Sequence, residues 1–324
     1  MENLVGDQTD PFQADPLLVV ILGPTGSGKT SLSVALGRHF DGEIVSCDSV
    51  AVYRGLEIGS AKPSAEQRIL VPHHLLDVVD PDAFYTAGDY SRDARAAIAA
   101  ITGRSRLPII TGGTGLYLRA LLQGLFPGPQ RSVALRDRLL RKAEARGALY
   151  LHRILKRLDP ASAVRIHAND VPKIVRAIEV TLAGSRPMSE ALQAGREPLT
   201  GYRVLRIGLD PIRPQLYQRI NARARAMFAQ GLLEETAELT ARYGHAPALD
   251  SLGYRQASQY LAGALTLEQA IAAASQGHRN YAKRQLTWFR REPDVRWLTG
   301  FGDDPSLRQA AESLIAEARA RQAP

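Results

Sequence analysis

The chain has 324 residues, 45% of them hydrophobic and 23% charged, which is the balance of a globular protein and excludes a disordered or fibrous chain. Its length suits two domains, its single cysteine excludes an internal disulfide or a multi-cysteine zinc site, and no apolar run approaches the roughly 20 residues that span a membrane. The formal net charge of +8 fits an RNA-binding surface and equally a set of solvated helix faces, so charge alone excludes neither.

The chain begins with an acidic stretch and continues with a buried strand. Residues 1–16 carry four acids and no base, and they lack the basic start and apolar middle of a secretory signal. We expect a short disordered tail there and a cytoplasmic location. The apolar run LLVVIL predicts a buried parallel strand at 17–22, followed by a glycine-rich turn and a helix at 30–40.

Further strands alternate with helices up to residue 123. Strands are predicted at 43–47, 75–79 and 107–111, and helices at 90–102 and 115–123. This alternation, with short glycine-containing turns, predicts an α/β fold whose parallel sheet is flanked by helices on both faces.

The periodicity changes near residue 131. From 131 to 184 it is helical only, a strand follows at 204–209, and helices are predicted from 214 to the end. We therefore predict a phosphate-binding α/β core formed by 17–130 and 199–324, interrupted by an all-helical insertion domain at 131–198.

Basic residues gather in three segments. Residues 131–180 hold twelve bases against five acids, residues 213–225 four arginines and no acid, and residues 276–297 six bases against two acids. Such clusters suit a polyanion-binding surface, because each neutralised phosphate releases counterions.

The strongest motif is a phosphate-binding loop, G-x-x-x-x-G-K-[ST], that connects the first strand to the first helix. Its members are Gly23, Pro24, Thr25, Gly26, Ser27, Gly28, Lys29 and Thr30. Glycines let backbone N–H groups surround phosphate oxygens at a helix N-terminus. Lys29 supplies a positive charge and the Thr30 hydroxyl can ligate Mg²⁺. The loop does not identify the phosphate compound, and ATP or GTP is the default ligand.

Two further elements follow strands and should face the same crevice. Asp48 ends the second strand, where the carboxyl ends of parallel strands meet the ligand. It can hold Mg²⁺, act as a general base, or simply cap the next helix. Thr114 lies in the segment 111–117 after another strand, where the alternative is an ordinary strand-to-helix turn.

A basic and aromatic segment lies near the end of the chain. Trp288 and Phe289 stand among Lys283, Arg284 and Arg290, a mixture that suits phosphate contact with base stacking. On a helix, the spacing of Leu286 and Phe289 is equally typical of a core.

These motifs together carry a family resemblance. The segments GPTGSGKT, CDSVAVYRGLEIGSAKP, PHHLLDVVDP, TGGTGLYLRALLQGL, RIHANDVPKIVRAIEV, LGYRQASQYL and AKRQLTWFRR occur in that order. With them the chain resembles the bacterial tRNA dimethylallyltransferases over about residues 17–298. The phosphate loop alone is unspecific, whereas the blocks that contain Asp48 and Trp288 are specific. A departure at Asp250 and Ser251 weakens Asp250 as an RNA contact.

The resemblance implies an activity. A dimethylallyl group passes from dimethylallyl diphosphate to the exocyclic N6 amine of the adenosine 3′-adjacent to the anticodon, in tRNAs reading codons that begin with U, and diphosphate is released. Because a stacked base cannot reach such a crevice, the adenosine must be flipped out. A small-molecule or nucleotide kinase, a prenyltransferase of free adenylate, and a non-catalytic RNA-binding protein remain as alternatives.

The resemblance also implies residue roles. Asp48 is the general base, Thr114 helps to hold substrate, and Lys29 and Arg223 contact the diphosphate, with Mg²⁺ as cofactor at Thr30 together with the diphosphate and water. The partners are the tRNA anticodon stem-loop and dimethylallyl diphosphate, and we expect a monomer. Contacts to tRNA are implied for Asp48, Ser49, Val50, Ala51, Thr114, Arg136, Pro172, Lys173, Ile174, Val175, Arg176, Gly253, Tyr254, Arg255, Lys283, Arg284, Gln285, Trp288 and Arg290.

Overall fold

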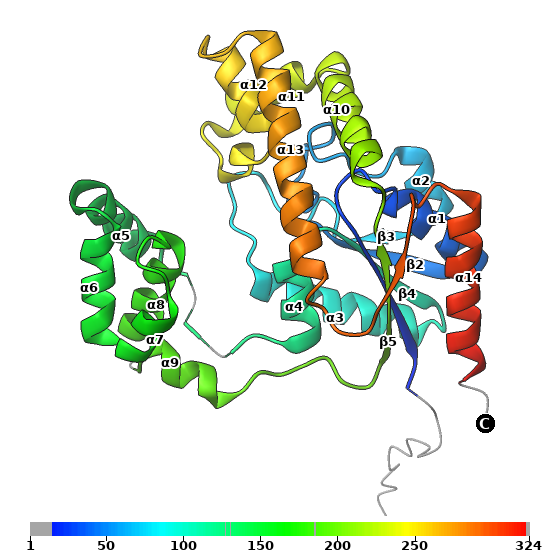
Figure 1. Cartoon of the computed structure of the whole chain (residues 1–324), viewed down its shortest axis with the longest axis horizontal. Coiled ribbons are helices and arrows are strands. Elements are labelled where there is room, and N and C mark those ends of the chain that lie inside the picture. The colour runs from blue at the N-terminus through cyan, green and yellow to red at the C-terminus, as the bar shows by residue number, and fades with distance from the viewer. Residues whose placement is uncertain (1–14, 127, 130, 185, 322–324) are drawn as a thin grey trace, which may run out of the picture. The chain divides into compact units, whose positions relative to one another are not determined.

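The structure is a computed structural model that describes residues 15–126, 128–129, 131–184 and 186–321 (Figure 1). The chain divides into two compact units, a core unit of residues 1–121 and 199–324 and a helical unit of residues 122–198. The helical unit thus begins before the predicted position 131. Of the tail predicted at 1–16, residues 1–14 lie outside the described residues, while Asp15 and Pro16 accept hydrogen bonds from Arg203.

The core unit is built on one parallel sheet of six strands in the order β3-β2-β4-β1-β5-β6. Its strands are β1 (Leu17–Leu22), β2 (Gly42–Cys47), β3 (His73–His74), β4 (Leu107–Gly112), β5 (Arg203–Leu209) and β6 (Val295–Leu298). Every paired neighbour runs parallel. All six residues of β1 are buried, as expected for a central strand covered on both faces.

Helices surround this sheet. They are α1 (Lys29–His39), α2 (Ala65–Leu70), α3 (Ala87–Gly103), α4 (Gly115–Gln123), α10 (Arg213–Ala229), α11 (Leu232–Tyr243), α12 (Tyr254–Leu261), α13 (Leu267–Phe289) and α14 (Pro305–Ala320), with a 3₁₀ turn at Pro247–Asp250. Alternate residues of β1 point to opposite faces. Val19 and Ile21 pack against α1 and α14, while Val20 lies on the side of Leu118 in α4 and Phe289 in α13.

The helical unit contains only helices among its described residues. They are α5 (Val133–Arg146), α6 (Ala148–Leu158), α7 (Pro160–Arg165), α8 (Val171–Ala183) and α9 (Met188–Ala191), followed by a 3₁₀ turn at Leu192–Ala194. Leu151, Leu155, Ile174 and Ile178 are fully buried and form its centre. The predicted fold class, a parallel α/β sheet with an all-helical insertion, is confirmed.

Three details differ from the sequence prediction. The strand predicted at 75–79 is wrong, because Leu75 and Asp77 adopt positive φ and end the extended run after β3. The all-helical prediction after residue 214 is wrong at β6, which pairs with β5 at the sheet edge. The short helix α2, closed by a capping box between Ser64 and Gln67, was not predicted.

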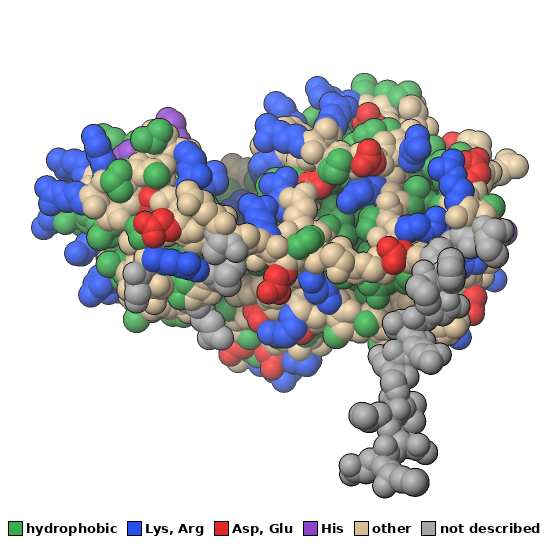
Figure 2. Space-filling view, turned by 90° about the horizontal axis from the view of Figure 1, so that it is seen from below, with side chains coloured by type: hydrophobic (Ala, Val, Ile, Leu, Met, Phe, Trp, Pro, Cys, Tyr) green, Lys and Arg blue, Asp and Glu red, His purple; other side chains and the backbone are tan. Residues whose placement is uncertain are grey.

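Surface charge follows the basic segments. Figure 2 shows lysine and arginine side chains spread over the helical unit. Ten of the twelve bases in 131–180 are exposed, and only Arg136 and Arg176 are half-buried. Within the described part of the chain, none of the helices has both the length and the apolar character to cross a membrane.

Candidate active site

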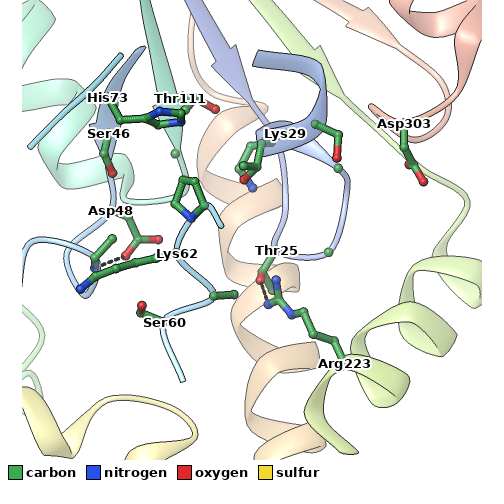
Figure 3. Close-up of a pocket in the computed structure, with 18 of the residues that line it drawn as sticks. Thr25, Lys29, Ser46, Asp48, Ser60, Lys62, His73, Thr111, Arg223 and Asp303 are labelled. Carbon is green, nitrogen blue, oxygen red and sulfur yellow. Dashed lines mark hydrogen bonds between the residues drawn. The ribbon is translucent and has the colours of Figure 1, made fainter. Parts of the chain in front are cut away.

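A cavity of about 250 Å³ opens in the core unit where β1, β2 and β4 end. It is lined by Thr25, Gly26, Gly28, Lys29, Thr30, Ser31, Ser46, Asp48, Ala51, Ser60, Ala61, Lys62, Pro63, His73, Thr111, Gly112, Arg219, Arg223 and Asp303. Figure 3 shows Lys29 and Asp48 on opposite sides of this space, with Arg223 entering from α10. The structure therefore brings together the predicted phosphate loop, the predicted base and the predicted arginine.

The backbone of the phosphate loop requires glycine. Gly26 and Gly28 adopt φ of 80° and 84°, a left-handed conformation that disfavours other residues. A Cβ on Gly28 would also lie 2.8 Å from the amide nitrogen of Gly302. The loop thus curls tightly into the start of α1, where the first amides of a helix can bind an anion.

Lys29 is folded back over the loop. Its Nζ donates hydrogen bonds to the carbonyl oxygens of Gly23 at 2.9 Å and Pro24 at 2.8 Å. Burial, and then the nearby charge of Arg223, lower the pKa of Lys29 to about 8, against the opposing effect of Asp48. An anion entering the cavity would supply the compensating charge that this amine lacks.

Two long helices fix the loop from outside. Arg223 on α10 donates from Nη2 to the Thr25 hydroxyl, and burial lowers the pKa of this guanidinium. Gln285 on α13 accepts a hydrogen bond from the Thr25 amide at 2.7 Å and donates to the Gly113 carbonyl at 2.9 Å. Gln285 is 4% exposed and ties the phosphate loop to the loop after β4; its contact with tRNA stays a prediction.

Asp48 caps the turn after β2, and Thr114 ties the ends of β2 and β4 together. One carboxylate oxygen of Asp48 accepts hydrogen bonds from the amides of Val50 at 2.8 Å and Ala51 at 3.2 Å. Asp48 therefore caps a turn, and the next helix begins only at Ala65. Thr114 accepts from the Ser49 amide at 3.0 Å and donates to the Ser49 hydroxyl at 3.2 Å. Both side chains thus have fixed orientations in the site.

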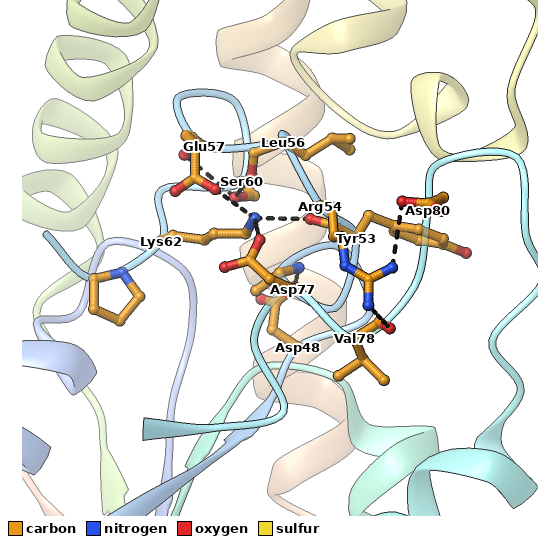
Figure 4. A network of polar contacts seen from close by, with 12 residues as sticks. Asp48, Tyr53, Arg54, Leu56, Glu57, Ser60, Lys62, Asp77, Val78 and Asp80 are labelled. Atoms are coloured by element: carbon orange, nitrogen blue, oxygen red, sulfur yellow. Dashed lines mark hydrogen bonds and ion pairs between the residues drawn. The ribbon is translucent and has the colours of Figure 1, made fainter. Parts of the chain in front are cut away.

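An ion cluster around the buried amine of Lys62 secures the segment that follows Asp48, and sequence reasoning missed it. Lys62, whose side chain is 1% exposed, donates to the Tyr53 carbonyl at 2.7 Å and to the carboxylates of Glu57 and Asp77 (Figure 4). Arg68 binds the same two carboxylates. The only signal was the presence of Glu57, Lys62 and Asp77 in two of the motif segments, which does not reveal their pairing.

The side chain of Tyr254, predicted to contact tRNA, lies inside the core unit. Tyr254 is fully buried, and its hydroxyl donates to Glu235 at 2.6 Å and accepts from the Gly59 amide at 3.1 Å. The Tyr254 side chain thus supports the segment around Gly59 from inside the core unit, and its contact with tRNA stays a prediction. The neighbouring Gly253 is also buried, whereas Arg255 is exposed.

The exposed side of α13 carries a groove of about 480 Å³, lined by Asn280, Lys283, Arg284, Thr287, Trp288 and Arg291. Trp288 packs on Gly115, where a Cβ would lie 2.3 Å from the indole nitrogen. Arg119 stacks 4.4 Å above the indole ring. Leu286 and Phe289 are buried on the other side of the helix, so that pair belongs to the core.

The predicted contacts in the helical unit separate into three kinds. The side chains of Ile174 and Val175 are buried in its centre, and their contacts with tRNA stay predictions. Arg136 and Arg176 both bind the buried carboxylate of Glu179. Pro172 and Lys173 are exposed, and Asp170 caps α8 by accepting from the Lys173 amide at 3.3 Å.

Comparison with known proteins gives concordant matches. The family models described as IPP transferase and isopentenyl transferase match residues 51–292 and 16–71. The tRNA dimethylallyltransferase of Koribacter versatilis is 63% identical over 303 residues, covering 93% of this chain and 99% of that protein. That of Solibacter usitatus is 52% identical, covering 93% and 98%.

Solved structures agree with the sequence matches. The tRNA isopentenylpyrophosphate transferase of Bacillus halodurans is 35% identical with a TM-score of 0.68, covering 95% of this chain and 99% of that one. A eukaryotic dimethylallyltransferase acting on tRNA is 25% identical with a TM-score of 0.79, covering 93% and 80%.

Proposed function

The chain belongs to the IPP transferase family, and we propose that it transfers a dimethylallyl group from dimethylallyl diphosphate to the N6 amine of the adenosine 3′-adjacent to the anticodon. The acceptors are tRNAs reading codons that begin with U, and the product released is diphosphate. One observation carries the proposal: a phosphate-binding loop and a carboxylate at a strand end line the same cavity.

The leaving group is the first requirement of this reaction. As the bond between C1 of the dimethylallyl group and the diphosphate oxygen breaks, negative charge grows on the diphosphate. The loop amides, Lys29 and Arg223 line the place where this charge develops. Removing one such preorganised donor typically costs roughly 3 kcal/mol of transition-state stabilisation.

The nucleophile is the second requirement. The N6 lone pair is delocalised into the adenine ring, so the amine attacks well only if a base takes its proton as the new N–C bond forms. One oxygen of Asp48 is held by two amides, and no other described residue is bound to its second oxygen, which is the proton acceptor in this mechanism. The proton thus passes from N6 to Asp48 while the electron pair of the C–O bond leaves with diphosphate.

Mg²⁺ is the proposed cofactor, and the residues present fit it. The Thr30 hydroxyl lines the cavity, and so do two buried polar atoms that have no partner among the described residues, Nε2 of His73 and Oγ1 of Thr111. Thr30 would hold the cation, which when bound offsets the charge of the leaving diphosphate.

The proposed acceptor is the anticodon stem-loop, with the adenosine flipped into the cavity. Exposed bases of the helical unit and the groove on α13 supply cations and an aromatic ring for phosphates and bases. We propose that the protein works as a monomer in the cytoplasm, the compartment of its tRNA acceptor.

The test is a transfer assay with purified protein, Mg²⁺, dimethylallyl diphosphate and an anticodon stem-loop RNA, read by mass spectrometry of the nucleosides. We expect prenylated adenosine from the RNA, none from free AMP, and no hydrolysis of ATP. Asp48→Asn should keep the turn and bind both substrates, yet turn over roughly 10²- to 10⁴-fold more slowly. Transfer to AMP, or ATP hydrolysis without transfer, would favour one of the alternative activities.

A further inference from the structure

One corner of the cavity is polar but carries no charge. Ser46 on β2 and Thr111 on β4 are register partners, and His73 on β3 pairs with Ile44, two residues before Ser46. These side chains therefore share one face of the sheet. Ile44 packs on Val34 of α1, so α1 covers this face of the sheet. Lys29 and Thr30 stand at the start of that helix.

Two atoms of this corner lack hydrogen-bond partners. Nε2 of His73 and Oγ1 of Thr111 are buried without a partner among the described residues. Figure 3 shows both side chains, together with Ser46, at the end of the cavity above Asp48. A buried polar group without a partner costs about 1–3 kcal/mol, so this corner is built for an occupant that forms hydrogen bonds.

The tautomer of His73 decides which kind of occupant fits. Nδ1 lies 2.8 Å from the Val71 carbonyl oxygen. Since a carbonyl only accepts, Nδ1 carries the proton and Nε2 is a bare acceptor. Burial lowers the pKa of His73, which favours this neutral form. The occupant must donate a hydrogen bond to Nε2, and an oxygen of diphosphate cannot.

Water bound to a metal ion meets this requirement. Waters of a hydrated Mg²⁺ are donors, and the imidazole nitrogen and the hydroxyl oxygens of Thr111 and Ser46 are neutral acceptors. We propose that His73, Thr111 and Ser46 are positioning residues that accept hydrogen bonds from the water ligands of the Mg²⁺–diphosphate complex. This inference rests on the proposed function. Because the three acceptors carry no charge, the cation binds mainly together with diphosphate.

Matched substitutions show whether His73 and Thr111 act as hydrogen-bond acceptors or only fill space. Asn at position 73 can keep the donor to Val71 but lacks the acceptor in the cavity, whereas Gln places an oxygen where Nε2 lies. Likewise Thr111→Val removes the hydroxyl and Thr111→Ser retains it. Calorimetry would measure the binding of inorganic diphosphate at a series of Mg²⁺ concentrations and in EDTA.

We expect His73→Asn and Thr111→Val to raise the Mg²⁺ concentration for half-maximal diphosphate binding by about five- to tenfold each. His73→Gln and Thr111→Ser should stay within about twofold of the wild type, and the diphosphate affinity in EDTA should be equal in all five proteins. If His73→Asn or Thr111→Val fails to fold, Ser46→Ala tests the same expectation at a position that is 7% exposed. It should raise the Mg²⁺ concentration for half-maximal binding about threefold.

Two results would overturn the inference alone. One is a Mg²⁺ dependence that is the same in all variants. The other is a diphosphate affinity in EDTA that falls as much as the affinity in Mg²⁺, because the residues would then support the loop or contact the diphosphate itself. A wild-type protein that binds no diphosphate in either condition would overturn the proposed function, and this inference with it.

Discussion

The buried carboxylate of Glu179 should control the stability of the helical unit. It lies on α8, is fully buried, and accepts four hydrogen bonds: from the Ser132 amide at 2.7 Å, from Arg136 at 2.9 and 2.8 Å, and from Arg176 at 2.7 Å. The hydrogen bonds of Arg136 and Arg176 outweigh the effect of burial and lower the pKa of Glu179 from 4.5 to about 2. The perturbation that tests this centre is Glu179→Gln.

The magnitude follows from the pKa. A depression from 4.5 to about 2, at about 1.4 kcal/mol per unit, corresponds to roughly 3 kcal/mol. Because the folded-state pKa is the lower one, this stability is present above pH 4.5 and is lost as the pH falls toward 2. Glu179→Gln removes it at neutral pH and leaves two guanidinium groups without their partner. We expect the free energy of unfolding of the helical unit to fall by about 3 kcal/mol. This is near the lower end of the range for breaking a buried ion pair, because both arginines reach solvent.

Hydrogen exchange of the full chain, read by mass spectrometry, gives the free energy of opening for each unit separately. In Glu179→Gln, peptides of α5 and α8 should exchange faster at pH 7, and peptides of the core unit should not change. Glu190→Gln, at an exposed acid on α9, is the matched control. The reasoning is refuted if the free energy of opening of the helical unit in Glu179→Gln lies within about 1 kcal/mol of the wild-type value. It is also refuted if the variant loses as much stability as the wild type between pH 4.5 and 2.

Three other substitutions have expected outcomes. Burial lowers the pKa of Lys29 from 10.5 to about 8, so its charge lowers the free energy of unfolding by up to about 3 kcal/mol below pH 8 and by nothing above pH 10.5. Lys29→Met should therefore be more stable than the wild type at pH 7 in denaturant titration without ligand, yet bind no diphosphate. A variant that is less stable and still binds diphosphate would contradict this. Lys173→Ala should reduce the salt slope of stem-loop binding by about 1 and leave the affinity for dimethylallyl diphosphate alone. Arg38→Ala, at an exposed base on α1 outside the basic segments, is the control, and an equal slope means that Lys173 contacts no phosphate. Tyr254→Phe should destabilise the core unit by about 1–3 kcal/mol in thermal unfolding, unlike the control Tyr260→Phe, and equal melting temperatures would show that the Glu235–Tyr254–Gly59 contacts carry no stability.

Local chemistry explains which parts of the site could be predicted from sequence. The phosphate loop is eight consecutive residues between a buried strand and a helix, so its identity and position depend only on neighbours in the chain. Asp48 was found in the same way, because a strand end in a parallel sheet has a known direction. The strands β1 and β4 could be recognised as continuous apolar runs. The two residues of β3 and the four of β6 are too few for any period to be recognised.

Long-range packing explains what the sequence could not show. Gln285 reaches the phosphate loop across 260 positions of the chain, and Glu235 reaches Ile58 across 177. No spacing rule connects such residues, since they meet only when α11 and α13 pack beside the end of the sheet. A glutamine in a basic, aromatic segment therefore suggests RNA, and its bond to the phosphate loop is visible only in the structure.

Helix geometry also limits how the implied tRNA contacts can be distributed. Successive residues of an α-helix point about 100° apart, so the run from Pro172 to Arg176 cannot present every side chain to one ligand. In α8 the exposed members are Pro172 and Lys173, while Arg176 turns toward Glu179.

In α13 the groove residues Lys283, Arg284, Thr287, Trp288 and Arg291 recur at three- and four-residue spacing and so form one face. Arg290 points away from this face and pairs with Asp210 at 3.1 Å. The groove thus contains Arg291, which the motif comparison did not select, in place of Arg290. A bound stem-loop that follows this face would meet the guanidinium of Arg291 rather than that of Arg290, because one step along the helix turns the side chain away from the groove.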